Sequence, residues 1–293
     1  MTTAYTDLLN WVMPDLPGAP PTTLVVNAIR DAVIEFCERS LCYRQELNQI
    51  LVLAPTSTTT TVAQVAGDSQ VTVASTTDFS NGDTMTVELT DGTKWRGHVS
   101  GAPAGLVITL DGTLPQAVDI GAAVTRLVYL YTITIPTGFA FVKGLSAWLN
   151  DAPIDPISQD DLDNEFNNTS FGWVGVNWRT DVNLPTRFYF PDDATVALAM
   201  PPSTQGALRV LAALKPTRAS TTFPTTIYER YVETIAHGAK AKVMLIPKKP
   251  YSDKDAGAFH LGMFNGLIGE ARIQVARAQT RAPLRTHTVF GLR

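Results

Sequence analysis

The sequence predicts an α+β fold: a helical bundle, made of an N-terminal helix and a C-terminal helical hairpin, with an antiparallel β-sandwich and an inserted small β-barrel domain. Three observations predict it. Apolar residues recur at helical spacing near the N-terminus and after Pro216, and short alternating segments fill the middle of the chain. Residues 55–125 are unusually rich in Thr, Val, Ser, Gly and Asp. The 293 residues suffice for about two domains.

The first expected element is a helix over residues 23–40. Its apolar residues recur at intervals of three and four, and the Pro-rich segment before it ends in threonines that can begin a helix. Residues 43–53 then alternate like a strand. The only two cysteines, Cys37 and Cys42, stand five positions apart across the expected helix end, so they are not expected to share a helical face, and we expect free thiols.

Residues 56–125 are expected to form the inserted small β-domain. Segments 70–75, 83–99 and 105–112 alternate like short strands, and Asp91-Gly92 predicts a hairpin turn because glycine tolerates positive φ. The run Thr58 to Thr61 is interpreted as a linker. The insert therefore separates two strands of one parent sheet, and residues 1–55 with 126–278 are expected to form the core domain.

The remaining elements follow from periodicity and turn residues. Strands are expected over 127–136, over 139–148 as its partner, and over 171–178, 186–191, 195–200 and 207–214. Ser158 is expected to cap a short helix over 158–166. The helical hairpin is expected to have apolar positions Ile227, Tyr231, Ile235, Ala239 and Val243 on its first helix and, after a cap at Ser252, Phe259, Met263, Leu267, Ala271 and Val275 on its second. Residues 279–293 contain Pro283 and no acidic group, which predicts an extended basic arm.

Charge is unevenly distributed along the chain. The net charge is −4, but residues 1–200 hold 9 basic and 22 acidic residues, whereas residues 201–293 hold 14 and 5. This asymmetry indicates an acidic partner or a nucleic-acid surface at the C-terminal end, or a solvated helical face with a basic tail. The C-terminal arginines lack interleaved aromatic residues apart from Phe290, so an acidic protein partner fits at least as well as DNA.

No catalytic, cofactor or metal site is expected. The sequence has no Walker, Rossmann or His-Glu-x-x-His motif. The acidic string 160–165 lacks the glycine and distant Glu of an EF-type calcium loop and suits a helix start. His237 and His260 lie at comparable distances from the hairpin turn and are placed to approach one another, but no third ligand completes a metal site, and surface histidines are the favoured interpretation. Neither a signal peptide nor a membrane span is visible, which predicts synthesis in a cytoplasm.

Several segments together resemble the head-to-tail adaptor (neck, connector or head completion) proteins of tailed bacteriophages. The resemblance rests on segments that follow in the order of that family: VVNAIRDAVIEFCERSLCYRQEL, ISQDDL, LPTRFYF, LAMPPSTQGALRVLAALKPT and the hairpin from YERYVETIAHGAK to GLIGEA. The insert segment GDSQVTVASTTDFSNGDTMTVELTDGTKWRGHVSG resembles small β-domains that recur in phage structural proteins.

The resemblance implies a structural virion protein of the neck or tail, made in the host cytoplasm, with no enzymatic activity and no membrane contact. It implies a ring, typically of twelve subunits, that joins the portal protein to a tail tube or nozzle protein and continues the channel for genomic DNA, which passes without sequence-specific contact. It also implies that the basic arm docks on the portal. The arm residues assigned to portal docking are Arg281, Leu284, Arg285, Val289, Phe290 and Arg293.

Other functions remain open at this point. Within phage proteins, a tail terminator or a minor tail protein is the nearest rival. A glycan-binding tail module would use Trp95 as its stacking aromatic residue. A tail enzyme such as a cell-wall hydrolase would need a carboxylate or Cys/His constellation that the sequence does not offer.

Overall fold

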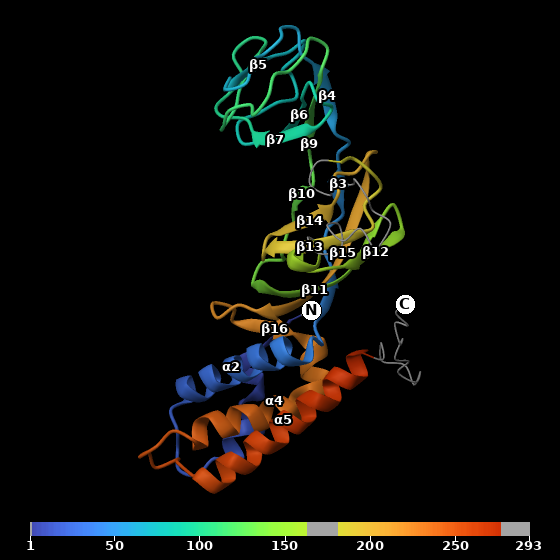
Figure 1. Ribbon diagram of the computed structural model, residues 1–293. Coiled ribbons are helices and arrows are strands. Elements are labelled where there is room, and N and C mark those ends of the chain that lie inside the picture. The colour runs from blue at the N-terminus through green and yellow to red at the C-terminus, as the bar shows by residue number, and fades with distance from the viewer. Residues whose placement is uncertain (1, 163–180, 277–293) are drawn as a thin grey trace, which may run out of the picture. The chain divides into compact units, whose positions relative to one another are not determined.

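The computed structural model describes residues 2–162 and 181–276. Chain contacts divide these residues into two compact units (Figure 1). Among the described residues, the helical unit comprises residues 2–46, 135–145 and 211–276, and the β unit comprises residues 47–134, 146–162 and 181–210. The fold is mixed α+β, as the sequence predicts. No helix among the described residues is both long enough and apolar enough to cross a bilayer.

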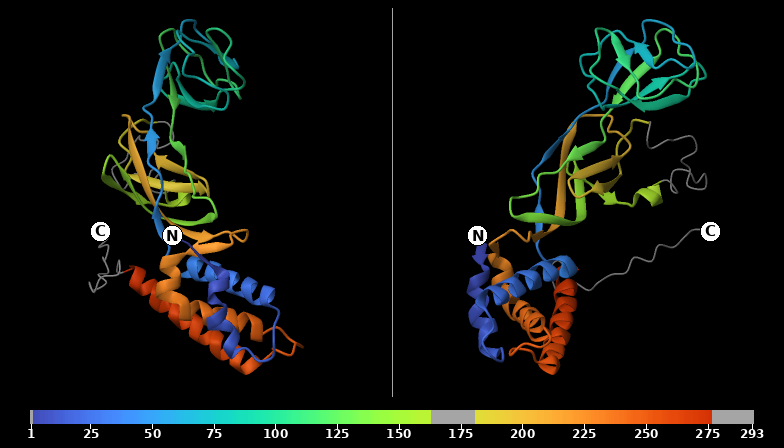
Figure 2. Two further views of the ribbon diagram at one scale, coloured as in Figure 1. Left: turned by 180° about the vertical axis from the view of Figure 1, so that it is seen from behind. Right: turned by 90° about the vertical axis from the view of Figure 1, so that its left-hand side faces the viewer.

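The helical unit is built around three long helices that lie side by side in every view (Figures 1 and 2). These are α2 (Thr22–Ser40), α4 (Thr225–Met244) and α5 (Lys254–Ala276). They share one hydrophobic core with short helices of the N-terminal segment: η1 (Tyr5–Leu8), α1 (Leu9–Val12) and η2 (Met13–Asp15). The expected helix after residue 23 is confirmed, while the N-terminal helices were not predicted from the sequence.

Two short strands, β1 (Thr2–Ala4) and β16 (Thr222–Pro224), pair antiparallel at the start of α4. The sequence did not predict them because three residues are too few to show an alternating pattern. The Thr3 hydroxyl donates a hydrogen bond of 3.1 Å to the Thr225 hydroxyl. The N-terminus is thereby attached to the first turn of α4.

The hairpin α4–α5 is present, with two local differences from expectation. Tyr231 has φ −131° and ψ 20°, so α4 is kinked there. At the start of α5, the Asp253 carboxylate accepts a 3.0 Å hydrogen bond from the Ala256 N–H. Asp253, one residue after Ser252, is therefore the side chain that caps the helix.

The largest sheet runs in the order β10-β14-β13-β12-β11-β15-β2, and β3 also pairs with β15. Its strands are β2 (Arg44–Glu46), β3 (Ile50–Val52), β10 (Leu130–Thr132), β11 (Phe139–Leu149), β12 (Ala152–Pro156), β13 (Arg187–Asp192), β14 (Thr195–Ala199) and β15 (Gly206–Pro216). The expected strand over 43–53 is thus two short strands, both paired with β15.

The sheet differs from the antiparallel arrangement expected. Strands β12 and β13 are parallel, with Asp155 opposite Arg187. The roughly thirty residues between them make a crossover possible, since a parallel pair needs a connection of about a dozen residues or more. Strand β10 pairs with β14 and not with β11, so the partner assigned to strand 139–148 was wrong.

The region between β12 and β13 is described only in part. Residues 159–162 are helical, and the Ser158 hydroxyl accepts a 3.1 Å hydrogen bond from the Asp161 N–H, which confirms the expected cap. The expected strand over 171–178 lies outside the described residues.

The inserted segment has its own hydrophobic core, which includes the fully buried Val71, Met85, Val87 and Ile108. Its strands are β4 (Thr56–Thr59), β5 (Gln70–Thr72), β6 (Thr84–Glu88), β7 (Lys94–His98), β8 (Val107–Thr109) and β9 (Ala123–Leu127). They form a sheet of order β4-β9-β6-β7 and a second sheet of β5 and β8.

The insert confirms one local prediction and corrects another. Strands β6 and β7 form the expected hairpin, and Gly92 in its turn has φ 80°. The run that begins at Thr58 is not a linker, because β4 pairs with β9 along its whole length. Threonine favours strands, so a threonine run next to a partner strand is readily recruited into the sheet. The strands that flank the insert, β3 and β10, belong to one sheet, as expected.

Candidate interaction surface

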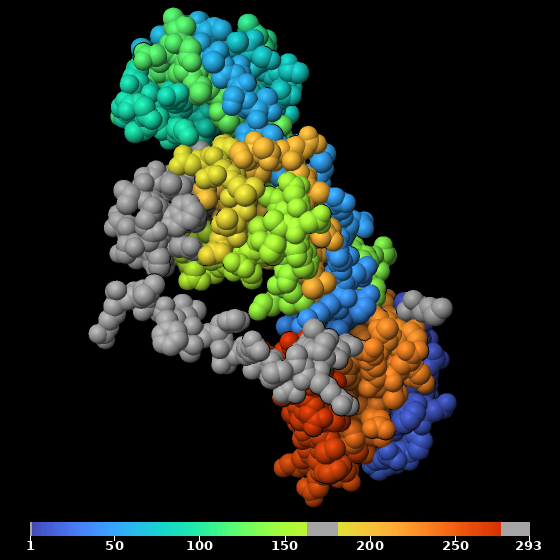
Figure 3. Space-filling model, turned by 90° about the vertical axis from the view of Figure 1, so that its right-hand side faces the viewer, coloured from blue at the N-terminus to red at the C-terminus, as the bar shows by residue number. Residues whose placement is uncertain are grey.

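The most unusual surface of the helical unit is one side of α5. Between Asp255 and Glu270 the sequence contains no charged residue. Much of this run faces solvent: Phe259 is 62% exposed, Met263 40%, and Ile273, one turn further on, 48%. Figure 3 shows α5, in red, on the surface of this unit. An isolated domain seldom leaves a helix face so apolar and uncharged.

Three glycines lie among these side chains. Gly262, Gly266 and Gly269 are exposed, and a Cβ added to any of them would meet nothing within 4 Å. Helical spacing places them on the side opposite the buried residues Phe264 and Ile268. A face with these glycines allows close approach by another backbone. We call this surface the α5 outer face; it consists of Phe259, Gly262, Met263, Gly266, Gly269 and Ile273.

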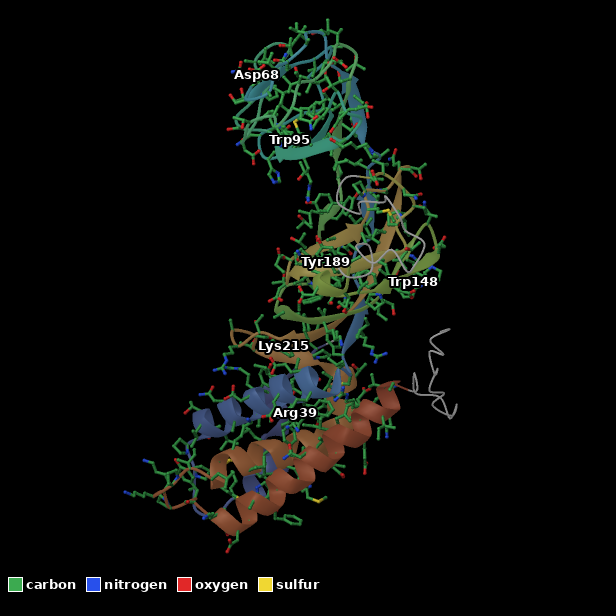
Figure 4. All side chains as sticks on the ribbon, viewed as in Figure 1. Arg39, Asp68, Trp95, Trp148, Tyr189 and Lys215 are labelled. Carbon is green, nitrogen blue, oxygen red and sulfur yellow. The ribbon has the colours of Figure 1, made fainter. Side chains whose placement is uncertain are left out.

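The opposite side of α5 is held firmly against its neighbours. Phe264 is 1% exposed and lies so close to Gly238 of α4 that a Cβ there would come within 2.7 Å of the ring. On α2, Arg39 donates hydrogen bonds to Asn265 at 2.7 Å and to Glu35 at 2.9 Å. Figure 4 marks Arg39 on α2. These contacts fix the rotation of α5 and so determine which face points outward.

The expected apolar positions of α5 are therefore only partly buried. Ala271 and Val275 belong to the buried side, but Phe259 and Met263 are exposed. The expectation failed because α5 is apolar on more than one side, and the spacing of apolar residues then does not identify the packed side.

Ion pairs join the elements that support α5. Lys240 of α4 is only 7% exposed and pairs with Asp15 of η2, and this hydrogen bond lowers the pKa of the Asp15 carboxyl. Lys242 donates to Glu35 of α2 at 2.7 Å. Burial raises the pKa of Glu35, but hydrogen bonds from Lys242 and Arg39 outweigh it and hold the pKa below the ordinary value.

His237 of α4 and His260 of α5 meet, as their places in the hairpin suggested. Their Nδ1 atoms are 2.7 Å apart, so one ring donates a hydrogen bond to the other. Burial lowers the pKa of both histidines; the charge of Lys240 adds to this for His237, and the charge of His237 adds to it for His260. Among the described residues no group of three His, Cys, Asp or Glu side chains is arranged to hold a metal ion.

A cationic cavity of about 460 Å³ adjoins α5. Arg39 of α2, Lys143 of β11 and Arg272 of α5 contribute positive charge to its wall, and Glu38 contributes a carboxylate. Glu38 is also paired with Lys215 of β15, which Figure 4 labels. The cavity therefore has a surplus of positive charge beside the α5 outer face, which suits an acidic side chain of a partner.

Trp95, the candidate for glycan stacking, lies in β7 of the insert (Figure 4). Its ring lies against Gly97, where an added Cβ would clash with the ring. A Cβ added to Gly112 would lie 3.8 Å from the same ring. Trp95 is half-buried and packs against the core of the insert. This packing gives the tryptophan a structural role within the β-domain.

The residues assigned to portal docking, Arg281 to Arg293, lie outside the described residues. Comparison with known proteins adds a decisive observation. Residues 107–287, more than half of the chain, match the model of the SU10 adaptor protein family. The chain belongs to this family. No curated protein sequence matches it.

Membership in this family makes the chain a bacteriophage structural protein of adaptor type, which interacts with other proteins of the virion. The match extends from β8 of the insert through strands β10 to β15 of the large sheet and both hairpin helices. It contains the whole α5 outer face. The resemblance inferred from sequence segments is thus confirmed at the level of a phage adaptor protein.

The sequence contains two features that indicate the outer face, although the spacing of its apolar residues did not identify it. A run of fourteen residues without charge, Ala256 to Gly269, is unusual for a helix at the surface of a unit this size. Four glycines within a 23-residue helix are a second signal, because glycine in a helix interior lowers stability by roughly 0.5–1 kcal/mol relative to alanine. Such a sequence is explained by contact with a partner more readily than by folding of the isolated chain.

Proposed function

We propose that the protein is a head-to-tail adaptor whose copies form a closed ring, and that this ring joins the portal to the tail and continues the DNA channel. Family membership supports the adaptor role. The observation that carries the ring is the α5 outer face, an exposed and largely apolar surface whose glycines leave room for a neighbouring helix. A second copy of this chain is its proposed occupant.

A closed ring needs two different complementary surfaces on each subunit, because its contacts are head-to-tail. The helical unit offers a second apolar site away from α5. Trp11 of α1 is 45% exposed, and α1 packs on α2 and α4. In the proposed ring, the α5 outer face of one subunit covers the α1 surface of the next.

The charge pattern supports a separate role for the arm. Residues 201–293 carry the excess of basic residues, and the arm itself contains no acidic one. We assign Arg281, Arg285 and Arg293 to charge-assisted hydrogen bonds with an acidic portal surface. Leu284, Val289 and Phe290 add apolar burial at about 25 cal/mol per Å².

Ring formation is tested by native mass spectrometry and electron microscopy of the full chain. Met263→Glu places a charge in the α5 outer face and is expected to raise the dissociation constant between subunits by at least about tenfold, a 1.4 kcal/mol effect. Leu51→Glu is the matched control, since Leu51 is 60% exposed on β3 of the β unit. A Met263→Glu protein that assembles like the wild type contradicts the role of α5.

Portal attachment is tested separately by truncation after Ala278. The shortened chain is expected to retain ring formation and to lose portal affinity, because the arm contributes contacts to the portal and none to the neighbouring subunit. Equal portal affinity of the shortened and full chains contradicts the arm assignment. A wild-type chain that binds a tail tube end and not the portal indicates a tail terminator instead.

A further inference from the structure

The two cysteines are brought together by the turn that ends α2. Leu41 has φ 55°, the left-handed conformation, and its N–H donates a 3.1 Å hydrogen bond to the Cys37 carbonyl. The chain thus turns back over the last helical turn. The Cys42 N–H donates to the Ser40 hydroxyl at 3.3 Å, and this hydroxyl donates to the Phe36 carbonyl at 2.6 Å. This turn brings the Cys42 side chain back to Cys37, and the contact between the two thiols shifts the pKa of both.

The two sulfur atoms differ in access to solvent. Cys37 is 0% exposed, whereas Cys42 is half-buried. Cys42 also lines a cavity of about 420 Å³, together with Arg44 of β2 and Arg230 of α4. A reagent in this cavity therefore reaches Cys42 and not Cys37. The two guanidinium groups in the wall favour a reagent that carries carboxylates.

The contact between the two thiols also shifts their pKa values in opposite directions. It lowers the pKa of Cys42 and, together with burial, raises the pKa of Cys37. The reactive form of cysteine is the thiolate. The sulfur that forms a thiolate more easily is thus the one that borders the cavity.

We propose that Cys37 and Cys42 form a thiol–disulfide exchange site, which reacts in the Cys42 cavity with anionic low-molecular-weight disulfides of the glutathione class. Cys42 is the attacking residue and Cys37 the resolving residue. The site is independent of the adaptor ring, because neither cysteine belongs to the α5 outer face.

The exchange proceeds in two balanced steps. The Cys42 thiolate attacks one sulfur of the disulfide, the disulfide bond breaks, and one glutathione thiolate leaves while a mixed disulfide forms on Cys42. Cys37 then attacks the Cys42 sulfur, the mixed disulfide breaks, and the departing glutathione takes the Cys37 proton. The protein loses two electrons and two protons overall, and the small disulfide is reduced to two thiols.

The test is intact-mass measurement of the reduced, folded full chain after incubation with oxidised glutathione. The wild type is expected to lose the mass of two hydrogen atoms. Cys37→Ser is expected to gain one glutathionyl group that persists, and Cys42→Ser is expected to remain unmodified until urea unfolds it. A folded wild type that stays reduced, or that stops at the glutathione adduct, overturns the proposal without any variant.

The anionic preference is tested with cystamine, a disulfide that carries two ammonium groups. Cystamine is expected to react about tenfold more slowly than oxidised glutathione at low salt. Arg44→Gln is expected to reduce this difference, since it removes one guanidinium from the cavity wall. Equal rates for the two reagents on the wild type overturn the proposed class of reagent.

Discussion

The helices α4 and α5 are adjacent in the chain and similar in length, yet their solvent-exposed sides differ in composition. In α4 the apolar side is buried and the remaining sides carry charged residues such as Glu229, Glu233 and Lys242. In α5 a buried side is present too, but the exposed side is apolar and rich in glycine. Folding of the chain thus buries the apolar side of α4, whereas α5 has a second apolar side that folding leaves exposed to solvent.

This difference shows how one helix serves folding and assembly at once. The buried side of α5 must hold the helix in place through Phe264 and Ile268, and the outer face must stay flat enough for a neighbour. Substitutions on the two sides should therefore affect different measurements. The buried side controls the free energy of unfolding, and the outer face controls the affinity between subunits.

The largest expected effect comes from the buried side. Phe264→Ala removes a ring that is 1% exposed and is expected to lower the free energy of unfolding by about 3–5 kcal/mol. Phe259→Ala is the matched change on the outer face, where the ring is 62% exposed, and its effect on the monomer is expected to stay within about 0.5 kcal/mol. Urea unfolding at a concentration that keeps the chain monomeric measures both. Similar losses for the two variants would contradict the division of α5 into two sides.

Glycines on the two helices give a second contrast. Gly238→Ala on α4 brings a Cβ against the Phe264 ring and is expected to destabilise the monomer by about 1–3 kcal/mol, because this ring is only 1% exposed and has little room to move. The same unfolding experiment measures the effect. A neutral Gly238→Ala would mean that Phe264 moves freely, and the rotation of α5 would then not be fixed by this contact.

Gly266→Ala on α5 should have the opposite sign. Nothing lies near the added methyl group, and alanine favours the helix, so the monomer is expected to gain about 0.5–1 kcal/mol. The affinity between subunits is expected to fall, since the methyl group occupies space that the proposed neighbour needs. A variant with a more stable monomer and an unchanged ring would show that the glycine is not at the subunit contact.

The same two helices show what sequence patterns can and cannot predict. The apolar spacing of α4 identified its buried side because charged residues mark the other sides. The spacing in α5 suggested Phe259 and Met263 as core positions, and the structure exposes both. A periodic pattern predicts that a helix forms, but only a contrast between apolar and charged sides predicts where it packs.

Tertiary contacts account for the other differences. Strands β1 and β16 have three residues each and are held by each other, so their own sequences carry little signal. The contact between Cys37 and Cys42 depends on the left-handed backbone at Leu41, a residue that seldom adopts it. In contrast, the β6–β7 turn was predicted from Asp91-Gly92, because there a local residue preference and the tertiary fold agree.

The smallest expected effect concerns pH and the contact between α4 and α5. The pKa values of His237 and His260 are lowered in the folded protein, so the unfolded chain binds more protons once the pH falls below about 6.5, the ordinary histidine value. The free energy of unfolding must then decrease as the pH falls from about 7 to 5. Asp15 and Glu233 oppose this trend through their negative charges, whereas Lys240 strengthens it.

His260→Asn tests this origin of the pH dependence. Asparagine keeps a polar group near the His237 Nδ1 atom but does not titrate, and His237 no longer faces a second ring that can become charged. Urea unfolding between about pH 7 and 5 is expected to show a shallower loss of stability than in the wild type. The Asp15 carboxylate, which pairs with Lys240, affects the free energy of unfolding in a lower pH range. Because its pKa is lowered in the folded protein, the stability that it contributes is lost only as the pH falls below about 4. If the free energy of unfolding of the variant falls as steeply between about pH 7 and 5 as that of the wild type, other groups take up the protons on unfolding. The contact between His237 and His260 would then not make the packing of α4 on α5 sensitive to pH.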